Sequence, residues 1–579
     1  MGAPAAVVAR HFWAERVQRT PDAPYLTWGD QTWTFASLDR WVHSLAHGLV
    51  AAGVQAGSRT AVLMPNSAQL VRAYLALMQL GATIVPLLPK APPGDIAFTL
   101  GHSGATSVLT DRAGCDLLAA VGSALPQMHR VIVLDELDPA GGPRLPAELI
   151  PQAAVESGHT HPVPDPRRSP RDPLAIIYTS GSTARPKGVV LPESSFGATG
   201  TAAAGRIGIT SRDTMYCVLP LCHCGGTHLA WATTIAAGCR FVLAERFSAR
   251  AFWPAVRAAG ATHVNLVPGM VAILNRALPA PSDRDHPLRV SIGATLDRQF
   301  VERFGVEMVM TWSMTETAAM GTMTTPLREH PDPRVAGRPL APVGETAVRD
   351  PQGNPCPPGQ TGEIWCRHEH VMTGYLDNEA ATAATLVDGW VRSGDLGVMD
   401  ADGALYFRGR LKNLIKRLGE NVSGDEVEHV LGTHPDVVEC LVLGVADPVR
   451  TEEVYAVLVT DLGSGLDAAA AVDWCRAHGL AEWKLPRYLR LQAAELPRLV
   501  NGKLDRAAVV RAVAEHDVLD REQGIIIRGS ALSDQFGAGQ SVPTGRLELP
   551  QPAATAKTRK AFLLAVITGV DEPATALIN

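Results

Sequence analysis

The 579-residue chain contains no apolar run of about 18 residues, the length needed to cross a bilayer. It also has no surplus of positive charge: 52 basic and 58 acidic side chains give a formal net charge of -6. That balance provides no whole-chain attraction to nucleic acid or anionic lipid. The first residues lack the basic segment followed by an apolar one that is typical of a secretion signal. We therefore expect a cytoplasmic protein without a membrane or nucleic-acid partner.

Lysine is scarce, because only eight of the 52 basic residues are lysines and the rest are arginines. A lysine that persists against this bias suits a position that needs a compact, mobile ammonium group. Four of the eight, Lys187, Lys412, Lys416 and Lys503, lie in the motifs described below. The nine cysteines are scattered and odd in number, which favours a reducing compartment over a disulfide framework.

The chain is too long for one ordinary core, and 46% hydrophobic residues with 19% charged ones indicate a globular protein. A strand over residues 59–66, a helix over 68–80 and a strand over 81–86 form a βαβ rhythm, which favours a mainly parallel sheet. From about 341 to 407, short strands alternate with Gly/Pro turns, which predicts a small β subdomain. We expect an α/β fold with a large N-terminal domain over residues 1–409.

A second, smaller α+β domain is expected over residues 413–516. Its pattern reads as a helix over 426–433, strands over 439–445 and 453–460, and a helix over 468–478. The final residues, 517–579, show no sustained period and several Gly, Pro and Ser residues, so we expect a flexible tail there.

The strongest motif is Ile176-Ile-Tyr-Thr-Ser-Gly-Ser-Thr-Ala-Arg-Pro-Lys-Gly188, an apolar strand that runs into a loop of hydroxyls and glycines and then a lysine. Backbone N–H groups and hydroxyls of such a loop can wrap a polyphosphate while Lys187 neutralises its charge. It is not a Walker A loop, because Pro186 and Gly188 stand where that motif needs glycine and Ser/Thr. The candidate phosphate-binding residues are Thr179, Ser180, Gly181, Ser182, Thr183 and Lys187.

This loop resembles the signature of the adenylate-forming superfamily of acyl-CoA synthetases, luciferases and peptide adenylation domains. Four further motifs follow in the family's order: Met310-Thr-Trp-Ser-Met-Thr-Glu316, Val391-Arg-Ser-Gly-Asp-Leu-Gly397, Gly409-Arg-Leu-Lys-Asn-Leu-Ile-Lys416 and Leu496-Pro-Arg-Leu-Val-Asn-Gly-Lys503. Within the family, Ile415-Lys-Arg-Leu-Gly-Glu-Asn-Val-Ser423 most resembles crotonobetaine/carnitine-CoA ligases.

The resemblance implies a role for each motif residue in forming an acyl-adenylate from a carboxylic acid and ATP. Glu316 and Thr183 would ligate Mg²⁺, and Thr315 would contact the α-phosphate. Trp312 would stack on adenine. Asp395, assisted by Arg410, would bind the ribose hydroxyls. Gly293 and Ala294 would also face the nucleotide. Lys503 would bridge the carboxylate and the α-phosphate, where negative charge builds during the reaction. Each residue alone has an ordinary structural reading, but the ordered set favours the catalytic one.

Lys503 lies beyond the expected domain boundary, so it reaches ATP only if the small domain folds over the large one. The resemblance implies rotation about a hinge, here residues 410–412, which exchanges Lys503 for the loop near Lys416 and Gly419. The cofactors and co-substrates implied are ATP, Mg²⁺ and CoA.

Three departures from the common family pattern bear on the acyl pocket. Ile292 and Ser313 stand where relatives have glycine, so the pocket should be shortened and suit a small or flat acid. The third is Pro220-Leu-Cys-His-Cys-Gly-Gly226, where Cys222 replaces an aromatic residue and His223 would line the pocket. A zinc site built from this cysteine- and histidine-rich segment is disfavoured, because no second ligand pair follows at finger spacing.

We expect an ATP-dependent carboxylic acid–CoA ligase that releases pyrophosphate. The first alternative keeps the adenylation but changes the acceptor or acid: loading of an acyl-carrier protein, amide formation, or nitrite activation for diazotisation. The second is a non-catalytic nucleotide-binding homologue, which would be expected to lack Lys503, Glu316 or Asp395, whereas all three are present. The sequence leaves the oligomeric state open.

Overall fold

The computed structural model describes residues 7–122, 128–135, 145, 147–179, 186–293, 296–340, 344–417, 420–447, 450–461, 463–499, 504–512, 517–521 and 525–528. The chain forms two compact units. The large unit comprises Met1–Ser393 and Gly397–Phe407, and the C-terminal unit comprises Gly394–Leu396 and Arg408–Asn579. The division falls after Phe407, so residues 410–412, the expected hinge, belong to the C-terminal unit.

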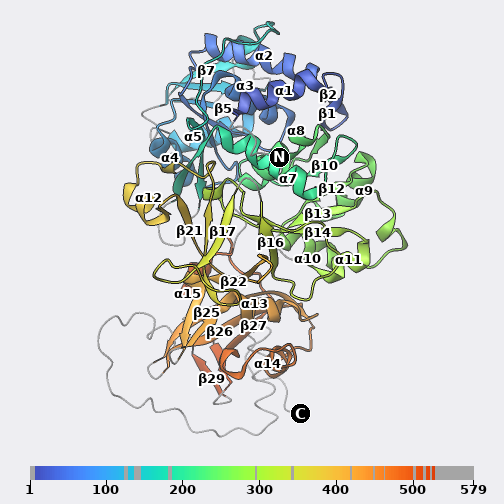
Figure 1. Cartoon of the computed structure of the whole chain (residues 1–579), viewed down its shortest axis with the longest axis vertical. Coiled ribbons are helices and arrows are strands. Elements are labelled where there is room, and N and C mark those ends of the chain that lie inside the picture. The colour runs from blue at the N-terminus through green and yellow to red at the C-terminus, as the bar shows by residue number, and fades with distance from the viewer. Residues whose placement is uncertain are drawn as a thin grey trace, which may run out of the picture. The chain divides into compact units, whose positions relative to one another are not determined.

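The larger sheet of the large unit has 14 strands, and its central strands β11, β10, β12, β13 and β14 run parallel to one another. The β-rich segment expected as a separate subdomain continues this same sheet through β16, β22, β21, β18 and β17 (Figure 1). In spatial order the strands are β17 (Glu345–Arg349), β18 (Thr361–Arg367), β21 (Trp390–Met399), β22 (Leu405–Arg410), β16 (Val335–Pro339), β15 (Thr322–Met323), β14 (Glu307–Trp312), β13 (Val290–Gly293), β12 (His263–Asn265), β10 (Thr214–Cys217), β11 (Arg240–Leu243), β1 (Pro24–Trp28) and β2 (Gln31–Thr34), with β20 (Leu386–Val387) pairing β21.

The second sheet of the large unit has eight strands and carries the phosphate-loop motif. Strands β3, β4, β5, β6 and β7 are parallel, whereas β8 and β9 form an antiparallel pair that β19 extends. In spatial order they are β19 (Gly374–Tyr375), β9 (Lys187–Pro192), β8 (Pro173–Thr179), β4 (Thr83–Pro86), β3 (Arg59–Leu63), β5 (Ser107–Thr110), β6 (Arg130–Val133) and β7 (Glu148–Pro151).

Helix α3 (Ala68–Leu80) has the bounds that the sequence predicts. The Ser67 side chain accepts a hydrogen bond from the Leu70 backbone N–H and so caps the start of the helix. Gly81 ends it in a left-handed conformation, with φ of 63°. Because Gly81 serves as the cap, the strand expected over 81–86 begins only at Thr83.

The main hydrophobic core of the large unit includes side chains from helices and from both sheets. It contains Leu38 of α2 (Phe35–Ala51), Tyr74 of α3, Ile177 of the eight-stranded sheet and Val309 of the 14-stranded sheet. Burial of this shared apolar surface is the main force that holds the two sheets together.

The remaining helices of the large unit connect or flank the strands of the two sheets (Figure 1). Among the described residues, no helix is long and apolar enough to span a bilayer. The helices, including short 3₁₀ and π segments, are α1 (Ala9–Arg19), α4 (Pro93–Ser103), α5 (Arg112–Val121), α6 (Gln152–Val155), α7 (Ser194–Ile207), η2 (Gly225–Trp231), α8 (Ala232–Ala237), α9 (Ala249–Ala259), α10 (Pro268–Arg276), η3 (Pro281–Arg284), α11 (Arg298–Phe304), η4 (Thr315–Thr317) and α12 (Glu379–Thr385).

The C-terminal unit is the expected α+β arrangement, and its first two helices and strands β25 and β26 begin and end within two residues of the predicted bounds. One sheet follows the order β24-β23-β26-β27-β28-β29, with β25 paired to β26. The elements are η5 (Leu411–Asn413), β23 (Leu414–Arg417), β24 (Glu420–Ser423), α13 (Gly424–Gly432), β25 (Val437–Asp447), β26 (Thr451–Thr460), α14 (Ala468–Ala477), η6 (Glu482–Lys484), β27 (Tyr488–Gln492), α15 (Arg506–Ala512), β28 (Asp517–Asp520) and β29 (Ile525–Arg528).

The expectation of a flexible tail from residue 517 is wrong for its first residues. Strand β28 pairs with β27, and β29 pairs with β28, so the sheet extends to Arg528. The sequence pattern misses these strands because each spans only four residues. Residues 529–579 lie outside the described residues.

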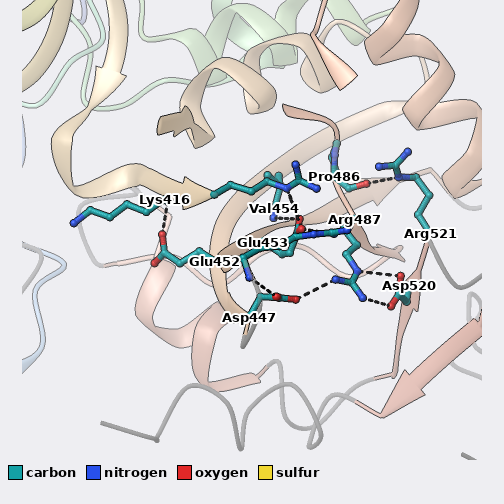
Figure 2. A network of polar contacts seen from close by, with 11 residues as sticks. Lys416, Asp447, Glu452, Glu453, Val454, Pro486, Arg487, Asp520 and Arg521 are labelled. Carbon is teal, nitrogen blue, oxygen red and sulfur yellow. Dashed lines mark hydrogen bonds and ion pairs between the residues drawn. The ribbon is translucent and has the colours of Figure 1, made fainter. Parts of the chain in front are cut away.

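A network of ion pairs attaches β28 to the rest of this sheet (Figure 2). Arg487 lies 3.0 Å from Asp447 at the end of β25 and 3.0 Å from Asp520 at the end of β28, and both carboxylates are buried. Glu453 of β26 is 0% exposed and pairs with Arg417 at 2.9 Å and with Arg450 at 2.6 Å. Buried carboxylates of this kind are tolerated only with paired cations, so the arginines are structural.

Arg487→Ala should destabilise the C-terminal unit by about 3 kcal/mol, because it removes the cation that two buried carboxylates face. Hydrogen exchange of the β25–β28 amides, followed by mass spectrometry, measures the effect as faster exchange. Arg476→Ala is the matched control: its partners Asp473 and Glu482 are exposed, and it should leave exchange unchanged. Equal protection in both variants would contradict a structural role for Arg487.

Candidate active site

The carboxyl ends of the parallel strands β10, β12, β13 and β14 lie at one edge of the 14-stranded sheet. Their register places Cys217 beside Asn265, Asn265 beside Ile292, and Gly293 beside Met310. Ligands of open α/β sheets bind at this edge. The segments that carry Cys222, His223, Thr315 and Glu316 follow these strand ends directly, so the topology brings separate sequence motifs to one place.

Glu316 lies in a tight turn, η4, just after β14, and only 8% of the residue is exposed. The two residues that follow closely, Ala318 and Ala319, have φ values of 53° and 60°. A left-handed conformation is unfavourable for alanine, and such strain persists only where the surroundings fix it. Two hydrogen bonds do so: Thr199 donates to the Ala318 carbonyl at 2.8 Å, and the Met372 N–H donates to the Glu316 carbonyl at 2.9 Å.

Tyr375 connects Glu316 to the phosphate-loop motif. Its hydroxyl donates to Glu316 Oε1 at 2.6 Å, and Lys187 Nζ lies 4.3 Å from the centroid of its ring. Burial, with the neighbouring Glu316 charge, raises the pKa of the Tyr375 hydroxyl, so it remains a donor. The Tyr375 side chain thus contacts the Glu316 carboxylate through its hydroxyl and the Lys187 ammonium through its ring. We call Lys187, Tyr375 and Glu316 the charge cluster.

The phosphate-loop motif is a β-hairpin-like pair of strands. Thr179 at the end of β8 pairs with Lys187 at the start of β9. The predicted phosphate-binding residues between them, Ser180, Gly181, Ser182 and Thr183, lie outside the described residues. Lys187 therefore enters the site at the base of the predicted loop, where an ammonium group can neutralise phosphate charge.

The Cys/His-rich segment packs against Glu316. Cys224 is 5% exposed, and burial together with the Glu316 charge raises the pKa of its thiol, while a hydrogen bond with Thr315 opposes that rise. Burial also raises the pKa of Cys222 to about 12, so both thiols are neutral. His223 is only partly buried. Among the described residues, no group of three His, Cys, Asp or Glu side chains is placed so as to hold a metal ion.

The next seven residues, Gly225–Trp231, form a π-helix, a rare element that is frequent at functional sites. His228 of this helix lies 3.2 Å from the Ser195 hydroxyl and 3.0 Å from the Thr227 hydroxyl. Burial lowers the pKa of His228 to about 4, so its ring is neutral at pH 7. The Thr227 hydroxyl also donates to the His223 carbonyl at 3.1 Å, so Thr227 connects His228 with the backbone of His223.

Trp312, the expected adenine platform, is buried in the β-rich part of the large unit. It is 5% exposed and belongs to a core cluster with Val348, Ile364 and Leu405. A Cβ atom added to Gly321 would lie 2.3 Å from the Trp312 carbonyl oxygen and 3.0 Å from Trp312 Cε3. Glycine is therefore needed at position 321, where the backbone packs against Trp312. Stacking of Trp312 on adenine stays a prediction.

In the C-terminal unit, the two predicted ribose-binding residues form an ion pair. Arg410 Nε lies 3.2 Å from Asp395 Oδ1, and Asp395 is 9% exposed. Lys416 of β23 is exposed, and its backbone N–H donates to Glu452 (Figure 2). Ala294 of the large unit and Gly419 and Lys503 of the C-terminal unit lie outside the described residues.

Comparisons with known proteins identify the family to which the chain is similar. The family described as AMP-binding enzyme matches residues 13–376, and its C-terminal domain family matches residues 426–503. The chain belongs to the AMP-binding enzyme family. The resemblance seen in the motifs is thereby confirmed, as are the α/β fold and the class of enzyme, an AMP-forming acid–CoA ligase.

Two curated relatives of this AMP-binding enzyme are CoA ligases. The sulfoacetate–CoA ligase of Cupriavidus necator is 34% identical over 506 residues, 85% of this chain and 95% of that protein. The crotonobetaine/carnitine–CoA ligase of Salmonella paratyphi A is 31% identical over 487 residues, 81% and 92%. The solved O-succinylbenzoate coenzyme A synthetase of Bacillus subtilis, in complex with ATP and magnesium ion, is 27% identical with a TM-score of 0.72, covering 86% of this chain and 98% of that one.

The cofactors of the family, ATP and Mg²⁺ with CoA as co-substrate, fit the residues present. Glu316 offers hard carboxylate oxygens, the ligand type that Mg²⁺ prefers, and among the described residues only its Oε1 is engaged by a hydrogen bond. When bound, Mg²⁺ supplies positive charge beside the phosphates. Lys187 supplies a second cation on the side of the predicted loop.

Sequence reasoning missed Tyr375, the π-helix and the strained turn. Tyr375 reaches the site because β19 pairs with β9, where its partner is Val189, a residue far earlier in the chain. No local pattern predicts such a pairing. The consecutive left-handed alanines have no sequence signal either, because glycine is the residue that usually marks that conformation.

Tyr375→Phe should lower adenylation, measured as ATP–pyrophosphate exchange, by about tenfold, because Glu316 loses the hydrogen bond that orients it. The same substitution in a Glu316→Gln background should add less than about twofold, because Tyr375 acts through that carboxylate. Tyr406→Phe, which removes a hydroxyl bound to Asp400, is the control without effect. Additive losses in the double variant would show that Tyr375 acts independently of Glu316.

Proposed function

We propose that the enzyme joins a small or flat carboxylic acid to CoA through an acyl-adenylate, with release of pyrophosphate. The charge cluster of Lys187, Tyr375 and Glu316 at the sheet edge is the observation that carries the proposal. Attack of a carboxylate on the α-phosphorus builds negative charge on both sides of one atom, and cations must gather there. The cluster supplies one ammonium group and one carboxylate suited to Mg²⁺.

Each half-reaction uses a different part of the chain. In adenylation, Lys187 neutralises the leaving pyrophosphate, Glu316 holds Mg²⁺, and Thr315 contacts the α-phosphate. Lys503 bridges the acid and the α-phosphate, and Asp395 with Arg410 binds the ribose. For thioester formation, rotation about residues 410–412 withdraws Lys503 and brings Lys416 and Gly419 toward the site, which clears the face that the thiol of CoA attacks.

We infer a small or flat acid because Ile292 and Ser313 carry side chains where relatives have glycine. Ile292 is 2% exposed and belongs to the same core cluster as Leu221 and Cys224 of the neighbouring segment. Cys222 is 8% exposed, and Ser313 is partly buried after β14. Since apolar interiors are close-packed, a long acyl chain would need room that a glycine in place of Ile292 or Ser313 would provide.

Lys503→Ala should slow adenylation by about 10² or more and leave thioester formation from a pre-made acyl-adenylate unchanged. Lys503→Arg should not restore the rate, because a planar guanidinium does not replace a compact ammonium. Lys90→Ala, which removes an exposed lysine, is the control. Equal losses in the two half-reactions would contradict the assignment.

A chain-length series tests the substrate class. Turnover should be highest with short-chain or planar acids, and Ser313→Gly should extend the range to longer chains. Pyrophosphate release with and without CoA, followed by mass spectrometry of the products, identifies the acceptor. Best turnover of the unaltered enzyme with long-chain fatty acids would refute the small-acid proposal. An adenylate that forms with an acid or nitrite and yields no CoA thioester would instead favour a carrier protein or an amine as acceptor.

A further inference from the structure

Asp425, near the start of α13, accepts hydrogen bonds from residues at both ends of the hinge segment. Its Oδ2 accepts a hydrogen bond from the Arg410 backbone N–H at 2.7 Å, and its Oδ1 accepts one from the Asn413 side-chain amide at 2.9 Å. The expected hinge, residues 410–412, begins at the first of these contacts and ends just before the second. Asp425 lies outside the motifs that predict the catalytic and nucleotide-binding residues.

Gly409, the residue before Arg410, lies so close to the start of α13 that a larger residue would clash there. Gly409 has φ of 113°, a left-handed value that favours glycine. A Cβ atom there would lie 2.3 Å from Ser423 Oγ and 2.9 Å from Asp425 Oδ2. The Ser423 hydroxyl in turn donates to the Arg408 carbonyl at 2.7 Å. The segment 408–413 is therefore held against α13 by specific contacts.

Asp425 also faces the helix that follows Lys503. Arg506, the first residue of α15, lies 3.3 Å from Asp425 Oδ1 and 2.7 Å from Glu428 Oε1, and its Nη1 donates to the Val442 carbonyl at 3.0 Å. Arg506 stands three residues after Lys503. One carboxylate thus connects the hinge backbone with the helix that follows Lys503 in the sequence.

Asp425 is not needed to begin α13. The N-cap is Ser423, whose hydroxyl accepts the Glu426 backbone N–H at 3.2 Å. Arg506 has a second carboxylate partner, because its Nη2 also contacts both oxygens of Glu428, at 2.7 and 2.9 Å. The side chain of Asp425 is one-fifth exposed, so its loss opens no large cavity.

We propose that Asp425 is a positioning residue that latches the hinge in one of the two arrangements that the two half-reactions require. The inference rests on the proposed function. Rotation of the backbone at residues 411–412 displaces the Arg410 N–H from Asp425, whereas Asn413, Asp425 and Arg506 stay together. The contact with Arg410 is then made in one arrangement only. A hydrogen bond to a charged group that forms in one arrangement only shifts the ratio of the two hinge arrangements by roughly tenfold to a hundredfold.

Asp425→Ala should change the ratio of the two half-reaction rates by about tenfold, with adenylation measured as pyrophosphate release and thioester formation measured from synthetic acyl-adenylate. Asp425→Asn keeps an acceptor oxygen and should change the ratio less. Asp473→Asn, which alters an exposed carboxylate of the same unit, is the matched control and should not change it. An unchanged ratio in Asp425→Ala, with both rates equally lowered or both unaltered, would overturn the proposal.

Limited trypsin digestion gives a readout that does not depend on activity. The hinge carries cleavage sites after Arg408, Arg410 and Lys412, and Asp425→Ala should be cut there several-fold faster than the unaltered protein and the control. Faster cleavage supports the latch even if the enzyme uses another acid or acceptor than the one proposed. Unchanged cleavage at these sites would overturn the latch while leaving the proposed function intact.

Discussion

A buried carboxylate that must stay accessible to one ligand is the constraint on which the site depends. Glu316 lies on a turn with two left-handed alanines, and hydrogen bonds from Thr199 and Met372 help to hold that backbone in place. Tyr375 orients the carboxylate and also carries Lys187 over its ring. Because Tyr375 and Lys187 belong to one sheet and Glu316 follows a strand of the other, the shared core of the large unit sets the geometry of the charge cluster.

The C-terminal unit uses charge in a different way. Its arginines pair with buried carboxylates and fix strands to one another, as Arg487 does between Asp447 and Asp520. Near the hinge, the same chemistry acts on the backbone, where Asp425 holds the Arg410 N–H. The preference of this chain for arginine over lysine suits such forked contacts, whereas Lys187 and Lys503 are the lysines that we propose to act on phosphate through a mobile ammonium group.

Local patterns predicted the elements that local forces determine. Helix α3 was predictable in full because Ser67 and Gly81 cap it, and the motif order predicted the family. Tyr375 was not predictable, since pairing between distant strands brings it to Glu316. Nor was β28, because four residues carry too little pattern and Arg487 supplies its anchor. The buried position of Trp312 depends on packing in the β-rich part, which the aromatic motif does not encode.

The most direct test is a crystal structure of the full chain with Mg²⁺ and a non-hydrolysable ATP analogue. We expect triphosphate density beside Lys187, with the metal ion on the Glu316 carboxylate at the carboxyl ends of β13 and β14. Density for the analogue at another place, with Glu316 still bound to Tyr375 alone, would contradict the proposed site.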